Sequence, residues 1–117
     1  MKIDFREENE KARKMMAELG KNLPAVMGAF GRLHGAASAD GALSPKVKEL
    51  IALAIGITVR CNGCIAYHVH DAAAAGASRD EILETIGVAI LMGGGPSVMY
   101  GAEALTALDQ LEAQPAA

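Results

Sequence analysis

Residues 61–68 read CNGCIAYH and contain both cysteines of the chain. Because helical residues three and four positions apart lie on one face, a helix here would place the thiols of Cys61 and Cys64 beside the imidazole of His68. Cα atoms at the spacing of the two cysteines are about 5–6 Å apart, within the range that a disulfide accepts. A disulfide that closes so short a loop hardly constrains the unfolded chain. The pair is therefore suited to reversible oxidation rather than to stabilising the fold.

The sequence on both sides of this motif predicts an all-α protein, a compact bundle of about six helices with Cys-x-x-Cys at the N-terminus of the fourth. Most of the expected starts carry a capping box, as at Ser78, or a first-turn proline, as in Ser44-Pro45. Gly20 is expected to end the first helix, and residues 93–95 to form a loop. No segment alternates with the period of a strand, so the βαβ context of a thioredoxin fold is absent. The expected helices cover about residues 4–19, 24–40, 45–59, 61–75, 79–92 and 96–112.

Length and composition favour a single domain over residues 1–117, with its core at about 20–110 and a frayed tail from residue 113. The net charge is −3 and no basic stripe is present, so nucleic acid is not an expected partner. The N-terminus lacks the apolar segment of a signal peptide, and the apolar run over 85–102 is interrupted by glycines and a proline. We therefore expect a cytoplasmic protein with no membrane contact. A chain this short with 51% hydrophobic residues is also expected to form a homo-oligomer.

Three chemical interpretations of the cysteine pair remain open. In the first, a redox dithiol, the N-terminal end of the helix and the neighbouring Arg60 stabilise a thiolate, and His68 exchanges protons with Cys64. In the second, Cys61, Cys64 and His68 bind zinc, with or without Glu49 as a fourth ligand, although a structural zinc site normally has a second ligand pair that this chain lacks. In the third, the cysteines are inert core residues.

The redox interpretation is favoured, because a Cys-x-x-Cys pair in a reducing compartment is seldom structural. Covalent haem attachment is excluded, since Ile65 stands where a histidine would have to follow the second cysteine. We expect neither a metal nor another cofactor.

Helix geometry also predicts which residues of the motif Glu49 can contact. In one straight helix, Glu49 would lie roughly 18 Å from Cys61, too far for contact. If the chain reverses near Arg60, the two helices run antiparallel and Glu49 reaches His68, directly or through a water, but not Cys64. The alternative is that Glu49 is an exposed carboxylate near the start of its helix, where it interacts with the helix dipole. Asp71 is an alternative partner, because it follows His68 by three residues on the same face.

Two further expectations concern helix faces. His34 lies on the apolar stripe of the second helix, where it could face the core or a site, and its expected role is that of a hydrogen-bonded structural histidine. The main apolar stripe of the third helix is expected to comprise Val47, Leu50, Ile51, Ala54, Ile55 and Thr58.

The spacing from Glu49 through Cys61-Asn-Gly-Cys64 to His68, with the following segment 76–82, resembles the alkylhydroperoxidase D-like branch of the carboxymuconolactone decarboxylase family. The resemblance covers about residues 20–110. It implies an all-α fold that assembles into homotrimers or homohexamers. It also implies that peroxide oxidises Cys64, that Cys61 resolves the product, and that Glu49 and His68 relay protons. The best-studied members have a histidine before the second cysteine, whereas this chain has Gly63.

The implied activity is reduction of hydroperoxides by a thiol-dependent peroxidase or dithiol–disulfide oxidoreductase in antioxidant defence. The electrons would come from a thiol reductant, such as a lipoyl or thioredoxin-type protein or a peroxiredoxin. One alternative is a redox-sensing or partner-binding protein without turnover. Another is a decarboxylase, which is less expected because the decarboxylases that name the family lack the cysteine pair.

Overall fold

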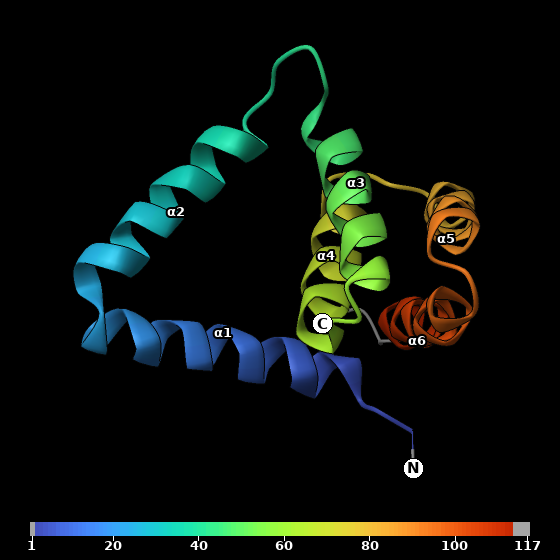
Figure 1. The fold of residues 1–117 in the computed structure, drawn as a ribbon, viewed down its shortest axis with the longest axis horizontal. Helices are drawn as coiled ribbons and strands as arrows, with labels where there is room; N and C mark the ends of the chain where they lie inside the picture. The colour runs from blue at the N-terminus through green and yellow to red at the C-terminus, as the bar shows by residue number, and fades with distance from the viewer. Residues whose placement is uncertain (1, 114–117) are drawn as a thin grey trace.

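The computed structural model describes residues 2–113, which form six helices and no strand (Figure 1). The all-α fold with the cysteine motif at the start of the fourth helix is therefore confirmed. Residues 114–117, most of the tail that was expected to fray, lie outside the described residues. The helices are α1 (Phe5–Asn22), α2 (Pro24–Ser38), α3 (Pro45–Thr58), α4 (Asn62–Ala74), α5 (Arg79–Gly93) and α6 (Gly95–Glu112).

The expected helix starts are confirmed where a side chain caps the helix. The Ser44 hydroxyl accepts a hydrogen bond from the Val47 N–H ahead of α3, and Ser78 and Glu81 form a complete capping box ahead of α5. Two of the expected helix boundaries are wrong, and the first is the end of α1. Helix α1 passes through Gly20 and ends only before Pro24, because a proline disfavours helical geometry in the residue that precedes it.

The second wrong boundary is the expected loop over residues 93–95. Only Gly94 separates α5 from α6, and it adopts φ 67° and ψ −149°, a conformation that essentially only glycine tolerates. A single residue therefore makes the corner between these two helices.

The core lies among α3, α4, α5 and α6, and α3 packs alongside α4 at the centre of the molecule (Figure 1). The face of α3 that is buried carries Leu53, Gly56 and Ile57, whereas Ile51 and Ile55 are about half exposed. The predicted main stripe of this helix is therefore wrong at Ile51 and Ile55, whereas its members Leu50 and Ala54 do pack against the core. Helix α3 is apolar on nearly every side, so periodicity alone could not choose its inner face.

Helix α2 lies outside this core, and most of α1 does as well, since it contributes only Phe5 to the core (Figure 1). Helix α1 buries only Phe5, and α2 buries no residue at all. Large apolar side chains such as Val26 and Leu33 are about 60% exposed, and Leu91 and Met92 at the end of α5 are nearly 80% exposed. None of the described helices is both long and apolar enough to cross a membrane.

Candidate redox site

The two cysteines lie at the N-terminus of α4, where Cys61 is the N-cap residue. The Cys64 backbone N–H donates a hydrogen bond to the Cys61 sulfur at 3.1 Å. The cysteines form a disulfide, and their Cα atoms are 5.2 Å apart, as the helical spacing predicts. The dithiol thus lies where the positive end of the helix dipole and the Cys64 backbone N–H both stabilise negative charge on sulfur.

Helix α3 holds this end of α4 through Gly56, a residue that the sequence did not single out as functional. The Cys61 N–H donates to the Gly56 carbonyl at 3.1 Å. A Cβ atom on Gly56 would lie 3.2 Å from the Cys64 Cβ, closer than most real contacts of this kind. The only signal in the sequence was a glycine inside an otherwise uninterrupted helical pattern.

Glu49 and His68 meet across α3 and α4. The His68 Nδ1 lies 2.7 Å from a Glu49 carboxylate oxygen, and both side chains are largely buried. The contact expected from the chain reversal near Arg60 is therefore present. With Nδ1–H donating to Glu49, the other ring nitrogen of His68 is left to accept a proton.

Asp71, the alternative partner of His68, is bound elsewhere. Its carboxylate accepts from Arg13 at 3.0 Å and lies 2.9 Å from the His70 ring. The Arg13 guanidinium also lies over the Tyr67 ring, 4.2 Å from its centroid. Arg13 therefore fastens α1 to α4 through Tyr67 and Asp71, which lie about one and two turns beyond Cys64.

A cavity of about 490 Å³ opens beside the dithiol. One wall comes from the start of α4 and includes both cysteines, Tyr67 and His68. The facing wall comes from α1 and α2 and comprises Ala12, Met16, Met27, Phe30, Gly31 and His34. The site is thus largely apolar, with the sulfur atoms and a few proton-exchanging groups at its edge.

A second cavity of about 260 Å³ adjoins the first one, between α2 and α3. Glu49 and Lys48 line it, and Phe30, His34 and His68 are common to both cavities. The His34 ring has no hydrogen-bond partner among the described residues and lines both cavities, which agrees with the alternative that it faces a site. Its ring lies instead edge-on to Tyr67, with 6.1 Å between centroids.

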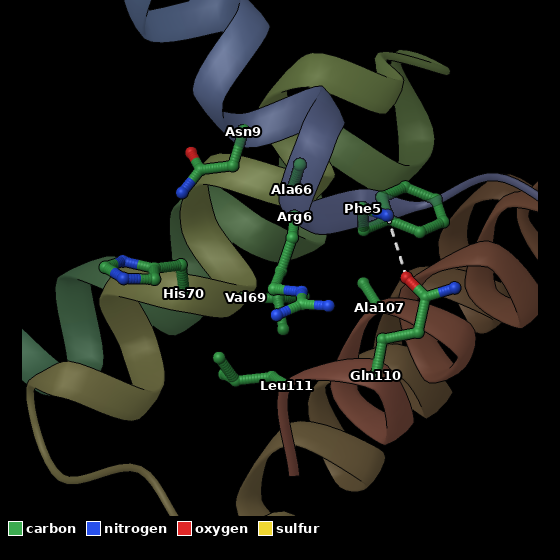
Figure 2. A pocket seen from close by; sticks show the side chains of 9 residues that line it. All are labelled: Phe5, Arg6, Asn9, Ala66, Val69, His70, Ala107, Gln110 and Leu111. Carbon is green, nitrogen blue, oxygen red and sulfur yellow. Dashed lines mark hydrogen bonds between the residues drawn. The ribbon is translucent and has the colours of Figure 1, made fainter. Parts of the chain in front are cut away.

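A third cavity, shown in Figure 2, holds only about 30 Å³, roughly the room for one water molecule. It lies between α1, α4 and α6 and contains neither cysteine. Beside it, the Phe5 N–H donates to the Gln110 side chain at 2.7 Å (Figure 2). The Gln110 side chain in turn donates to the Ile3 carbonyl, also at 2.7 Å. These bonds fasten the N-terminal segment to α6. The residues around this cavity therefore hold the fold together and do not belong to the candidate redox site.

Residues 2–113 contain no group of three or more His, Cys, Asp or Glu side chains arranged to hold a metal ion. The absence of zinc from the purified protein stays a prediction.

The fold and the site together define a small all-α protein with a disulfide-forming Cys-x-x-Cys pair next to a carboxylate–imidazole pair. The chain belongs to the carboxymuconolactone decarboxylase family, whose sequence profile matches residues 24–107. The alkylhydroperoxidase D-like branch, to which the motif pointed, is consistent with this assignment.

Two curated relatives match most of the chain. An uncharacterised protein of Cupriavidus necator is 36% identical over 113 residues, which is 97% of this chain and 100% of the relative. An uncharacterised protein of the cox locus of Paracoccus denitrificans is 34% identical over 102 residues, covering 87% of this chain and 92% of its own length.

Two solved structures share the fold. The apo form of a carboxymuconolactone decarboxylase family protein of Legionella pneumophila is 43% identical with a TM-score of 0.87, covering 91% of this chain and 95% of that one. A family member of Thermotoga maritima, described with a possible involvement in the antioxidative response, is 30% identical with a TM-score of 0.77. That match covers 87% of this chain and 90% of the other.

Proposed function

We propose that this protein is a thiol-dependent peroxidase that reduces hydroperoxides through Cys64 and Cys61. One observation carries the proposal: a redox-capable cysteine pair and a Glu49–His68 pair converge beside one apolar cavity. The relative from Thermotoga maritima described with a possible antioxidative involvement agrees with this chemistry.

In the proposed first step, His68 takes the proton of Cys64, and Glu49 holds the imidazole through its Nδ1–H. The Cys64 thiolate then attacks the terminal oxygen of the hydroperoxide. The O–O bond breaks, Cys64 becomes a sulfenic acid, and the remaining oxygen leaves as an alkoxide that is protonated to the alcohol.

In the second step, Cys61 resolves the sulfenic acid. The hydrogen bond from the Cys64 N–H stabilises negative charge on the Cys61 sulfur, and a thiolate is the form that attacks. The new S–S bond expels hydroxide, which leaves as water after taking a proton. An external dithiol, such as a lipoyl or thioredoxin-type protein, then reduces the disulfide by thiol–disulfide exchange; a peroxiredoxin is the other partner that the resemblance implied.

We also propose that the protein works as a homotrimer or homohexamer in the cytoplasm. Helix α2 buries no residue within its own chain, so a second copy of the chain would cover apolar side chains that are exposed in a single copy. Light scattering at micromolar concentration tests the assembly, and a monomer would contradict it.

Single-turnover peroxide consumption by the reduced protein, with mass-spectrometric mapping of the products, tests the chemistry. Cys64→Ser should abolish consumption. Cys61→Ser should consume about one equivalent and leave a sulfenic acid on Cys64 that dimedone traps. His68→Ala and Glu49→Gln should each slow the reaction by about 10²-fold or more, the usual effect of losing a proton-transfer group.

His70→Ala provides the matched control, because His70 is exposed, lies on the same helix and does not line the dithiol cavity. A dimedone adduct on Cys61 in the Cys64→Ser protein would reverse the assigned order of the cysteines. Turnover with several hydroperoxides, each paired with lipoyl, thioredoxin-type and small-thiol reductants, then identifies the reductant. Oxidation of the pair without turnover in any combination would point to a redox sensor instead.

A further inference from the structure

The wall that faces the dithiol across the larger cavity offers one proton donor. Of the six α1 and α2 residues on this wall, only His34 carries an N–H or O–H on its side chain. Its ring is half-buried and makes no hydrogen bond to another described residue. The edge-on contact with Tyr67, which follows Cys64 by one helical turn, places it near the dithiol.

The direction in which the leaving oxygen points decides which wall of the cavity can supply its proton. A sulfur nucleophile that cleaves an O–O bond attacks along the axis of that bond, so the leaving oxygen points away from the sulfur. Cys64 lies on α4, and the leaving oxygen is therefore directed towards the wall built by α1 and α2. His68 and Tyr67 lie on α4 with the attacking sulfur, and His68 already has the task of taking the thiol proton.

We propose that His34 is the proton donor to the leaving oxygen, an inference that rests on the proposed peroxidase function. As the Cys64 sulfur forms its bond to the terminal oxygen, the O–O bond breaks and the electron pair moves to the distal oxygen. The protonated His34 ring gives one N–H proton to that oxygen, becomes a neutral imidazole and releases an alcohol. The cavity that adjoins both His34 and the Glu49–His68 pair provides the route by which the ring is reprotonated.

A comparison of two peroxides of similar size but different leaving groups tests this role. Cumene hydroperoxide releases an alkoxide, which needs a proton. Peroxybenzoic acid also carries one benzene ring but releases benzoate, which is stable without a proton at neutral pH. Single-turnover rates of the reduced protein are measured with each, and the rate of Cys64→Ser is subtracted as background.

We expect His34→Gln to lower the rate with cumene hydroperoxide by about 10²-fold and the rate with peroxybenzoic acid by less than about 3-fold. His34→Asn, which also removes the imidazole, should show the same selective loss. His70→Gln is the matched control and should change neither rate. Because α2 buries no residue, these substitutions leave the core intact, and circular dichroism verifies this for each variant.

Equal losses with both peroxides would show that His34 only shapes the cavity, and unchanged rates would show that it has no part in the reaction. Either result overturns the inference and leaves the peroxidase function standing. If the wild type consumes neither peroxide faster than Cys64→Ser does, the proposed function itself fails, and the role of His34 fails with it.

Discussion

Replacing Gly56 by alanine tests how tightly α3 fixes the dithiol. The new Cβ would lie 3.2 Å from the Cys64 Cβ, 3.7 Å from the Cys64 carbonyl carbon and 3.8 Å from the Ile65 nitrogen. The first distance requires a shift of a few tenths of an ångström, and the nearest atoms belong to the backbone and Cβ of α4 rather than to a flexible side-chain end. The start of α4 must therefore move, and the two sulfur atoms with it.

Two opposing contributions determine how much Gly56→Ala changes the free energy of unfolding. Alanine gains about 1 kcal/mol over glycine inside a helix. Overpacking of a buried contact costs about 1–3 kcal/mol, so Gly56→Ala should lower the free energy of unfolding by about 1 kcal/mol. Gly87→Ala is the matched control, because Gly87 lies inside α5 with no atom within 4 Å of its would-be Cβ. That variant should gain up to about 1 kcal/mol, so the two should differ by about 2 kcal/mol.

Urea unfolding under reducing conditions measures both variants at one protein concentration, since association would shift the apparent stability. The shift in midpoint at constant slope gives the stability change, and single-turnover peroxide consumption reports the effect on Cys64. Gly56→Ala should react more slowly than Gly87→Ala. If Gly56→Ala proves as stable and as fast as the control, Gly56 does not position the dithiol and the close contact has no energetic consequence.

Three further predictions concern other parts of the chain. Arg60 adopts φ 61°, a left-handed conformation that favours glycine, so Arg60→Gly should raise the free energy of unfolding by about 1 kcal/mol in urea titrations, and a loss would contradict this. Hydrogen bonds from the Lys46 ammonium and then the Ser78 N–H lower the pKa of Glu81, so its stabilising contribution is present above the unfolded value of about 4.3 and is lost as pH falls through the lowered folded value. Glu81→Gln should therefore flatten the acid limb of the stability profile below about pH 4, and an unchanged limb would refute the linkage. Protein purified under reducing conditions should carry no stoichiometric zinc; elemental analysis that finds about one zinc per chain, lost in Cys61→Ser, would support the zinc interpretation instead.

The sequence by itself determined the elements and the spacing within the motif. Ser44-Pro45 and the Ser78–Glu81 capping box start their helices through bonds between near neighbours, so no distant residue was needed to predict them. The sequence predicted the meeting of Glu49 and His68, which lie 19 residues apart, only on the condition that the chain reverses near Arg60. The capping bonds are local, and the sequence records them directly.

Only the tertiary structure decided which faces are buried and what stands opposite the dithiol. Helix α3 is apolar nearly all round, so the choice of Leu53 and Ile57 over Ile51 and Ile55 depended on the position of α4 and α5. The same holds for His34, which reaches the cavity only because α1 carries α2 away from the core and sets it across from α4. Packing between distant segments is decided by the combined shapes of several helices, and periodicity within one helix carries no record of it.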